Sequence, residues 1–269
     1  MGRTEELGRL LDSLEAQRYP SARVLAVDQN RDGRLDAVLS GRDVDIVRLE
    51  SAPGLSRARN VGLASVAADI VAFPDDDCEY PPGLLERVAG RLGAEPALDG
   101  LAGRAEDVSR RSSPSWETDV ALLTDDNLWN RANAATIFLR RSLVERIGAF
   151  DERLGLGSEE AWSSGEETDY LIRAVRAGAR IEYDPSLVVL HDVRADDTRI
   201  GLRDGASVGY LLRKHRYSPR VLARMLVRPM GGVVLATVRL DLPRASYYVA
   251  TLRGRIRGYL GASRSKISA

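Results

Sequence analysis

Short apolar segments alternate with helical patterns through the first 190 residues, and this alternation limits the fold more than any other feature. The apolar segments have the length of strands, and the segments between them carry apolar residues at helical spacing. Alternation of this kind is typical of βαβ units, with a mostly parallel sheet covered by helices. The expected strands are 23–27, 44–49, 69–73, 134–139, 180–183 and 187–190, and the expected helices are 4–17, 56–67, 82–92, 142–147 and 168–177.

The chain is expected to divide into two parts. The first part, 1–199, carries the alternating pattern, whereas the second part, 200–269, is helical in pattern and basic. From Tyr210 to the end there are thirteen Lys or Arg residues and one acid, Asp241. The whole chain has a formal net charge of zero, so the rest of it is acidic. Such asymmetry indicates that the basic part contacts something anionic, such as a membrane surface or the acidic part itself.

Composition narrows the class of protein further. With 44% hydrophobic residues and one cysteine, the chain can bury a core but cannot form a disulfide framework. No apolar run reaches the roughly 18 residues of a spanning helix, and the longest, between Arg228 and Arg239, contains a proline and two glycines. We therefore expect a cytoplasmic protein or one peripheral at the inner face of the membrane. Two polar stretches, 104–118 and 154–165, are expected to be loops.

Three consecutive aspartates, Asp75, Asp76 and Asp77, follow the apolar segment that ends at Phe73. In open α/β sheets, ligands bind beyond the carboxyl ends of the strands. Adjacent carboxylates repel each other, and a divalent cation that prefers oxygen ligands, Mg²⁺ or Mn²⁺, relieves that cost. A solvated acidic turn is the alternative interpretation. His191 follows the last expected strand and is a further candidate ligand, although a lone histidine is more often structural.

Two further segments suggest a nucleotide site. Asp28 follows the strand 23–27, where a carboxylate accepts hydrogen bonds from a ribose or a base edge; a turn-initiating aspartate is the alternative. The segment GLSRARNVGL, 54–63, opens a helix with Arg57 and Arg59 near its start, and a helix N-terminus with arginine suits a phosphate. Only two of the 39 basic residues are lysine, so an arginine-rich surface helix is the alternative there.

A cluster of acids begins the helix expected after the second loop. Glu166, Glu167 and Asp169 lie in the segment SGEETDYLIRAVRAG, which starts at Ser164. One of them is a candidate general base, because a helix start holds a side chain rigidly. The alternative is structural: Ser164 and Glu167 have the spacing of a capping box, and acids in a first turn interact favourably with the helix dipole.

Taken in order, these segments resemble the family 2 glycosyltransferases with the GT-A fold. The resemblance runs from about Arg3 to Asp192 and rests on LLDSLEAQRYP, VLAVDQN, GLSRARNVGLASVAADIVAFPDDDCEYPPG, FLRRSLVERIGAFDERLG, GEETDYLIRAVRAG and IEYDPSLVVLHD. It implies an α/β, Rossmann-like GT-A domain with a mixed, mostly parallel sheet flanked by helices, and then a helical segment. It also implies an inverting transfer of a sugar from a nucleotide-diphosphate sugar to an acceptor hydroxyl, with Mn²⁺ or Mg²⁺ as cofactor.

The resemblance assigns the aspartate triplet to the family's DXD motif. Asp77 is then the direct metal ligand, Asp75 is the other end of the motif, and His191 is a further metal ligand. The nucleotide-binding residues implied in the same way are Asp28, Arg59, Asp75 and Asp76.

The resemblance also places the general base and the acceptor. Glu167 occupies the place of the catalytic aspartate in the family's E-D pair, and Glu166 and Asp169 remain rivals for this role. The acceptor is expected over 128–140 and 155–164, where Trp129 and Trp162 are candidates to stack on a sugar ring. Both tryptophans have core packing as the alternative.

One part of the family pattern is missing, namely a buried strand before the first helix. The chain enters the helix directly after Arg3, so we expect a gap in the sheet. This departure supports a second hypothesis, a non-catalytic or truncated relative that acts as a binding or scaffold protein. A sugar nucleotidyltransferase is a third hypothesis, but it needs a glycine-rich basic loop near the N-terminus that the sequence does not have.

The expected partners follow from these interpretations. They are a nucleotide-diphosphate sugar donor and a carbohydrate, lipid-linked or small-metabolite acceptor, and nucleic acid is not expected. The basic segment 210–269 is expected to form an amphipathic helix on an anionic membrane. The alternative is a helix that packs on the catalytic domain or at a homodimer interface.

Overall fold

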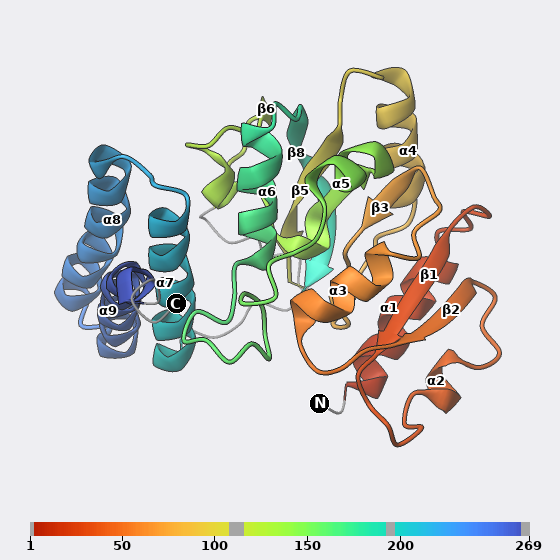
Figure 1. Ribbon diagram of the computed structural model, residues 1–269, viewed down its shortest axis with the longest axis horizontal. Helices are drawn as coiled ribbons and strands as arrows, with labels where there is room; N and C mark the ends of the chain where they lie inside the picture. Colours follow the sequence, from red (N-terminus) through yellow and green to blue (C-terminus); the bar gives the residue numbers. More distant parts are fainter. Residues whose placement is uncertain (1–2, 108–115, 192–196, 265–269) are drawn as a thin grey trace. The chain divides into compact units, whose positions relative to one another are not determined.

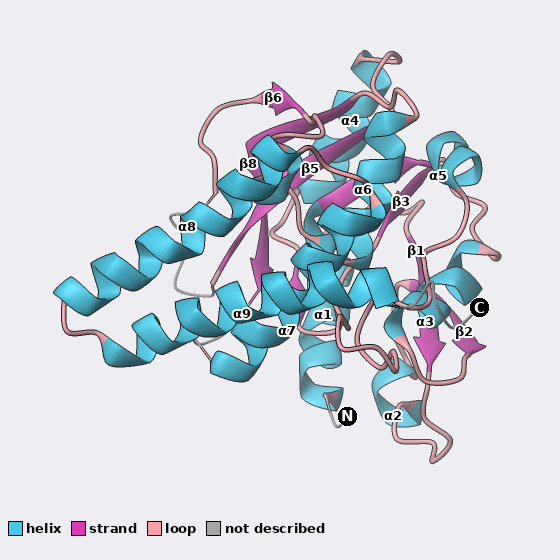
Figure 2. Ribbon diagram, turned by 60° about the vertical axis from the view of Figure 1, so that its left-hand side comes forward, coloured by secondary structure: helices cyan, strands magenta, loops and turns pink. Residues whose placement is uncertain are grey.

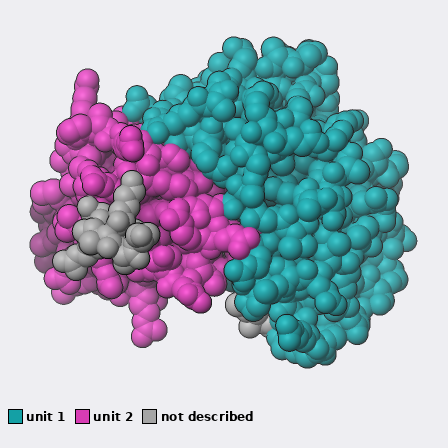
Figure 3. All heavy atoms as spheres, in the orientation of Figure 1, with its two compact units in different colours: residues 1–53, 57–150, 170–193 teal, residues 54–56, 151–169, 194–269 magenta. Residues whose placement is uncertain are grey.

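The computed structural model describes residues 3–107, 116–191 and 197–264 (Figure 1). The chain forms two compact units, each assembled from several segments (Figure 3). Unit 1 comprises 1–53, 57–150 and 170–193, and unit 2 comprises 54–56, 151–169 and 194–269. Unit 2 therefore contains the predicted C-terminal helical segment together with 54–56, 151–169 and 194–199, which the sequence placed in the first domain.

Unit 1 contains two sheets, and most of their strands are labelled in Figure 1. In the smaller, β1 (Arg23–Asp28) and β2 (Asp45–Glu50) are parallel neighbours. The larger has the order β3-β7-β5-β8-β4, with β6 paired to β8 off this path. Its strands are β3 (Ile70–Ala72), β4 (Cys78–Glu79), β5 (Gly100–Glu106), β6 (Ala121–Leu122), β7 (Ile137–Arg140) and β8 (Ile181–His191).

The α/β class is confirmed, but the pairing is more antiparallel than the sequence predicted. Strands β1–β2 and β5–β8 pair in parallel, whereas β3–β7, β5–β7, β4–β8 and β6–β8 are antiparallel. Within the described ranges no ladder links β1 with β3. The described strands of unit 1 therefore form two separate sheets.

Several strand boundaries differ from the prediction. Residues 134–136, expected to begin a strand, form the short helix η2, and β7 begins only at Ile137. Strand β8 is continuous where two strands were expected, and the β5–β8 register shifts near Gly103. Pro185 lies in this part of β8. A proline fits where the ladder is interrupted, because its nitrogen has no hydrogen to donate. Strand β5 reaches Glu106 and so takes the first residues of the predicted loop 104–118, of which 108–115 lie outside the described residues.

Helix α1 (Thr4–Glu15) fills part of the core beside the aspartate triplet. Its buried residues are leucines at helical spacing, as the sequence predicted. The backbone N–H of Tyr80 donates to Ser13 Oγ at 3.0 Å, and Gln17 Nε2 donates to the Tyr80 carbonyl oxygen at 2.7 Å. These bonds hold the chain just after the triplet against α1. The surrounding core comprises Leu10, Leu14, Cys78, Tyr80, Leu84, Val88, Leu92, Leu98, Leu101, Ala135, Phe138, Leu187 and Val189.

The remaining short elements complete unit 1. They are α2 (Asp36–Leu39), α4 (Leu84–Ala94), α5 (Arg141–Ile147), η1 (Leu128–Asn130) and η2 (Ala134–Thr136). Two further helices, α3 (Leu55–Leu63) and α6 (Glu166–Arg176), contribute residues to both units.

Three long helices make up most of unit 2: α7 (Thr198–Lys214), α8 (Pro219–Val238) and α9 (Leu242–Arg264) (Figure 2). Glycines let α7 and α9 approach at backbone distance. A Cβ at Gly205 would lie 2.4 Å from the Thr251 carbonyl oxygen, and a Cβ at Gly258 would lie 1.9 Å from that of Ala206. Side chains do not fit at these positions, so glycine spacing determines the packing of this pair.

Helix α8 corrects the expectation that no segment has the length of a spanning helix. It is a 20-residue helix, long and apolar enough to cross a bilayer by length and composition, and 17% of its most apolar window is buried. It continues through Pro229, which cannot donate to the carbonyl oxygen of Met225 one turn earlier. Arg255 of α9 donates to that oxygen instead. Burial, assisted by the charge of Arg228, lowers the pKa of Arg255 to about 10.

Candidate active site

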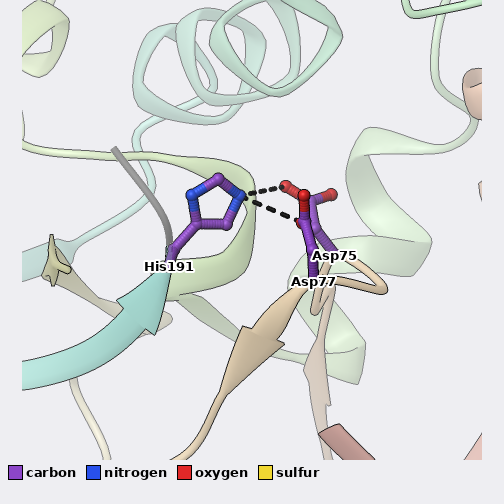
Figure 4. Close-up of side chains that lie close together, drawn as sticks. All are labelled: Asp75, Asp77 and His191. Carbon is purple, nitrogen blue, oxygen red and sulfur yellow. Dashed lines mark ion pairs between the residues drawn. The ribbon is translucent and has the colours of Figure 1, made fainter. Parts of the chain in front are cut away.

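The aspartate triplet and His191 are brought together by strand pairing. The triplet forms the turn between β3 and β4, and the Cys78 N–H closes it with a hydrogen bond to the Asp75 carbonyl oxygen at 3.2 Å. Strand β4 pairs with the end of β8, and the register places Cys78 opposite His191. His191 Nε2 lies 3.2 Å from Asp77 Oδ1 and 3.7 Å from Asp75 Oδ2 (Figure 4). The predicted metal ligands therefore converge.

The donor set of this group suits a divalent ion. One ligand atom from each of Asp75, Asp77 and His191 lies within 4.8 Å of the others, and all three residues are half-buried. Two carboxylates offer the oxygen ligands that Mg²⁺ and Mn²⁺ prefer, and an imidazole adds a nitrogen that suits a transition ion. Asp76 is different, because its side chain is 55% exposed. The structure thus separates the outer members of the triplet from the middle one.

Two arginines face the triplet. Arg59 of α3 donates to Asp75 Oδ1 at 3.1 Å, and Arg3 contacts Asp76 Oδ1 at 2.9 Å and Asp77 Oδ2 at 2.5 Å. The Arg59 side chain is only 9% exposed and lies over the ring of Phe150 at 5.6 Å. These guanidinium groups offset the repulsion among the carboxylates. The predicted nucleotide residue Arg59 is therefore part of the same cluster as the metal group.

Asp28 lies at the end of β1, as predicted, and its side chain is buried. It accepts hydrogen bonds from the Asn30 N–H at 2.8 Å and from Arg48 Nη2 at 2.6 Å. Burial alone would raise the pKa of Asp28, but these hydrogen bonds outweigh it and lower the pKa below its ordinary value. Asp28 is therefore a carboxylate acceptor already held in place.

The three candidate acids of α6 lie in unit 2 and have different surroundings. Asp169 has no exposed side-chain surface, and its Oδ1 receives Lys214 Nζ at 2.5 Å and His215 Nε2 at 2.7 Å. Glu166 is buried, whereas Glu167 is half-buried. Of the three, Glu167 has the most access to solvent, which favours it as the base.

The loop before α6 is shaped around Glu166. Gly155 has a positive φ of 90°, and a Cβ there would lie 2.8 Å from Ser56 Oγ and 3.4 Å from Glu166 Oε2. Ser56 Oγ also donates to the Leu154 carbonyl oxygen at 2.6 Å. The Ser164 hydroxyl donates to Asp204 Oδ1 of α7 at 2.9 Å, and its oxygen lies 2.8 Å from Ser207 Oγ of the same helix. The first turn of α6 is thus tied to α7.

The two tryptophans have unequal exposure. Trp129 of η1 is half-buried, and its Nε1 donates to the Asp125 carbonyl oxygen at 3.3 Å. Trp162 is buried and stacks on Tyr210, with ring centroids 4.6 Å apart and an interplanar angle of 6°. One face of Trp162 is therefore covered by protein, which favours packing over sugar binding; an acceptor role for either tryptophan stays a prediction.

Sequence reasoning missed the cations that complete these clusters, namely Arg3, Arg48, Lys214 and His215. A signal existed for the last two: the chain has only two lysines and two histidines, and one of each is adjacent at the end of α7. Their pairing with Asp169 could not be predicted from the sequence, because Asp169 and Lys214 are 45 residues apart in the chain.

Solved structures share this fold. A mannosyltransferase, PcManGT from Pyrobaculum calidifontis in complex with GDP-Man and Mn²⁺, aligns with a TM-score of 0.65 at 16% identity, over 95% of this chain and 83% of that one. S. aureus TarS 1–349 in complex with UDP-GlcNAc aligns with a TM-score of 0.57 at 17% identity, over 97% and 90%. The mixed α/β architecture is therefore that of the GT-A glycosyltransferases, as the sequence predicted.

Sequence comparison identifies the family. The family model for glycosyl transferase family 2 matches residues 2–147, more than half of the chain, and the chain belongs to this family. It is 28% identical over 238 residues to the pre-mycofactocin glycosyltransferase of Mycobacterium tuberculosis, covering 79% of this chain and 46% of that relative. It is 24% identical to glycosyltransferase AglE of Haloferax volcanii, and the alignment covers 91% of this chain and 80% of that relative. The chain thus spans about half the length of the first of these relatives.

Proposed function

We propose that this chain is a glycosyltransferase that moves a sugar from a nucleotide-diphosphate sugar to an acceptor hydroxyl with inversion at the anomeric carbon. The observation that carries the proposal is the Asp75, Asp77 and His191 group at the strand ends of a family 2 chain. Two structures with the same fold were solved with nucleotide sugars, GDP-Man in one and UDP-GlcNAc in the other. The acceptor is a glycan, a glycolipid or a small metabolite.

The metal and nucleotide roles follow from the clusters of unit 1. Asp75, Asp77 and His191 would hold Mn²⁺ or Mg²⁺, which as a Lewis acid stabilises the charge that develops on the leaving diphosphate. The imidazole ligand favours Mn²⁺, since Mg²⁺ is bound mainly through oxygen. Asp28 accepts hydrogen bonds from the nucleoside, and Arg59 together with Asp76 completes the nucleotide site.

The base is assigned to Glu167. The acceptor hydroxyl must lose a proton as it attacks the anomeric carbon, and a carboxylate can take that proton. The sugar carbon gains oxocarbenium character, and a single displacement inverts its configuration. Glu166 is the second candidate. Asp169 has a different role, because Lys214 and His215 already occupy its carboxylate and hold the start of α6.

Titration calorimetry with UDP, dTDP and GDP, with and without Mn²⁺, tests the donor site. We expect one nucleotide to bind in a metal-dependent way and Asp77→Ala to lose the metal-dependent part. Glu86→Ala, which removes an exposed carboxylate on α4, is the control and should bind like the parent chain. Equal metal dependence in Asp77→Ala and the parent would contradict the assignment.

Kinetics with sugar donors that carry the nucleotide so identified test the general base. Glu167→Gln should lower kcat by roughly 10²–10⁴, with nucleotide affinity unchanged, because the acceptor proton loses its carboxylate. Hydrolysis of the donor in the absence of acceptor gives a readout that does not depend on knowing the acceptor. A chain that binds the nucleotide but neither transfers nor hydrolyses would instead be the non-catalytic binding protein.

A further inference from the structure

Helix α8 has two different faces within unit 2. One face packs on α9: Met225, Pro229 and Ala236 are buried, and a Cβ at Gly232 would meet the ring of Tyr248 at 2.8 Å. Figure 2 shows the two helices side by side, joined by the short turn after Val238. The packing of α8 on α9 therefore leaves the opposite face of α8 uncovered by α9.

The opposite face is apolar and exposed. Val227, Met230, Val234 and Val238 recur at intervals of three or four residues, which places them on one side of the helix, and each is more than half exposed. The stripe continues through the turn. We call it the apolar ridge, and its members are Val227, Met230, Val234, Leu235, Val238, Leu240 and Leu242. These are seven of the twelve exposed large hydrophobic residues in the described part of the chain, so the exposure is concentrated there.

Arginines accompany the ridge. Arg220, Arg224 and Arg228 are exposed and follow one another at four-residue intervals in the first half of α8, and Arg239 and Arg244 are exposed beside the turn. The acid nearby is Asp241, and its carboxylate is used to cap α9, since the Arg244 N–H donates to it at 3.1 Å. Exposed cations thus accompany the apolar ridge, and the sequence of α8 contains no acidic residue.

From this arrangement we infer that the α8–α9 turn docks on an anionic phospholipid bilayer. The ridge enters the boundary between headgroups and acyl chains, and the arginines contact the lipid phosphates while their stems lie along the apolar surface. A bilayer fits better than a protein partner, because apolar and cationic side chains are arranged along one helix face without polar hydrogen-bonding groups of defined geometry. The inference concerns unit 2 alone and does not depend on the proposed reaction.

Vesicle co-sedimentation of the full chain tests the inference. Vesicles of phosphatidylcholine with about 30% phosphatidylglycerol are compared with vesicles of phosphatidylcholine alone. We expect binding to the anionic vesicles that is at least tenfold stronger than to the neutral ones, and weaker as the salt rises from about 0.1 to 1 M. Equal binding to both compositions would overturn the electrostatic part of the inference.

Two variants separate the ridge from the arginines. The first combines Val234→Gln, Val238→Gln and Leu240→Asn; asparagine suits the last position because Leu240 has a positive φ of 58°. It should lose at least tenfold in affinity for anionic vesicles. The second, Arg220→Gln with Arg239→Gln, should lose roughly 30-fold, because each surface cation contributes about a fivefold factor.

A matched control replaces exposed apolar residues outside the ridge. Val120→Gln with Leu156→Gln removes exposed apolar surface outside the ridge and should bind vesicles like the parent chain. Circular dichroism and light scattering accompany each variant. Unchanged vesicle binding by the ridge variant would overturn the inference. A second result would also overturn it, namely a parent chain that is dimeric and does not bind vesicles, together with a ridge variant that is monomeric. In that case a second copy of the chain covers the ridge.

Discussion

Asp169 and Glu167 are two positions apart at the start of α6, yet their side chains have different environments. Asp169 is fully buried and receives Lys214 and His215, and Lys214 also contacts Asp151 at 2.8 Å. The hydrogen bonds that Asp151 accepts from Arg153 and Lys214 outweigh its burial and lower its pKa. Asp169 therefore belongs to a buried ion-pair network that holds the start of α6, whereas Glu167 is half-buried.

We predict that Asp169→Asn destabilises the protein by about 3 kcal/mol, because it removes one partner from a buried ion pair. This free energy is at the low end of the range for a broken buried ion pair. The reason is that Lys214 keeps its ion pair with Asp151 in the variant and its side chain is 22% exposed. Urea unfolding measures the effect. The control is Asp45→Asn, which breaks an ion pair whose two side chains are more than half exposed and should cost less than about 1 kcal/mol. Similar losses in both variants would show that Asp169 is not a structural anchor.

At the scale of elements, glycine spacing determines how the helices of unit 2 pack. Gly201, Gly205 and Gly209 follow one another at four-residue intervals on α7, and Gly254 and Gly258 do so on α9. Each of these positions has a backbone atom of the other helix within 3.0 Å of its hypothetical Cβ. Burial of backbone against backbone leaves no room for adjustment, so the contact is sensitive to a single methyl group.

We predict that Gly209→Ala destabilises unit 2 by roughly 1–3 kcal/mol or more, because its Cβ would lie 2.0 Å from the Arg255 carbonyl oxygen. Gly231→Ala on α8 is the matched control: nothing lies within 4 Å of its Cβ, and alanine there should stabilise the helix by about 0.5–1 kcal/mol. Thermal and urea unfolding of both variants measure the difference. A destabilised Gly231→Ala or an unaffected Gly209→Ala would refute close packing as the cause.

At the scale of the whole molecule, local patterns predicted what depends on local sequence. Periodicity predicted the ends of β1 and β3 to within one residue and the start of α6 to within two, so the metal and acid candidates could be named in advance. The residues that pair with these candidates could not be predicted in the same way. Arg3 meets Asp77 across 74 residues, and the span of α8 depends on Arg255, which accommodates Pro229 from another helix. Such contacts arise only when distant elements pack, and a one-dimensional pattern does not contain them.

The metal group also has a consequence for the stability of the folded chain. An ion that binds only the native state stabilises it by about 2.7 kcal/mol at a concentration of about 100 Kd. For a chain of this size, that free energy raises Tm by roughly 5–10 °C. We therefore predict that Mn²⁺ raises Tm in a calorimetric scan and that a chelator reverses the rise.

The variants determine where the stabilisation originates. His191→Gln should reduce the Mn²⁺-dependent rise and Asp77→Ala should abolish it, whereas Glu86→Ala should retain it. Asp75, Asp77 and His191 all belong to unit 1. The scan can resolve two transitions, one for each unit. Mn²⁺ should then raise the Tm of the unit 1 transition, and Asp77→Ala should abolish this rise. The Tm of the unit 2 transition, which Gly209→Ala lowers, should not respond to Mn²⁺. An equal rise in the parent chain and in Asp77→Ala would show that Mn²⁺ acts at another place in the molecule.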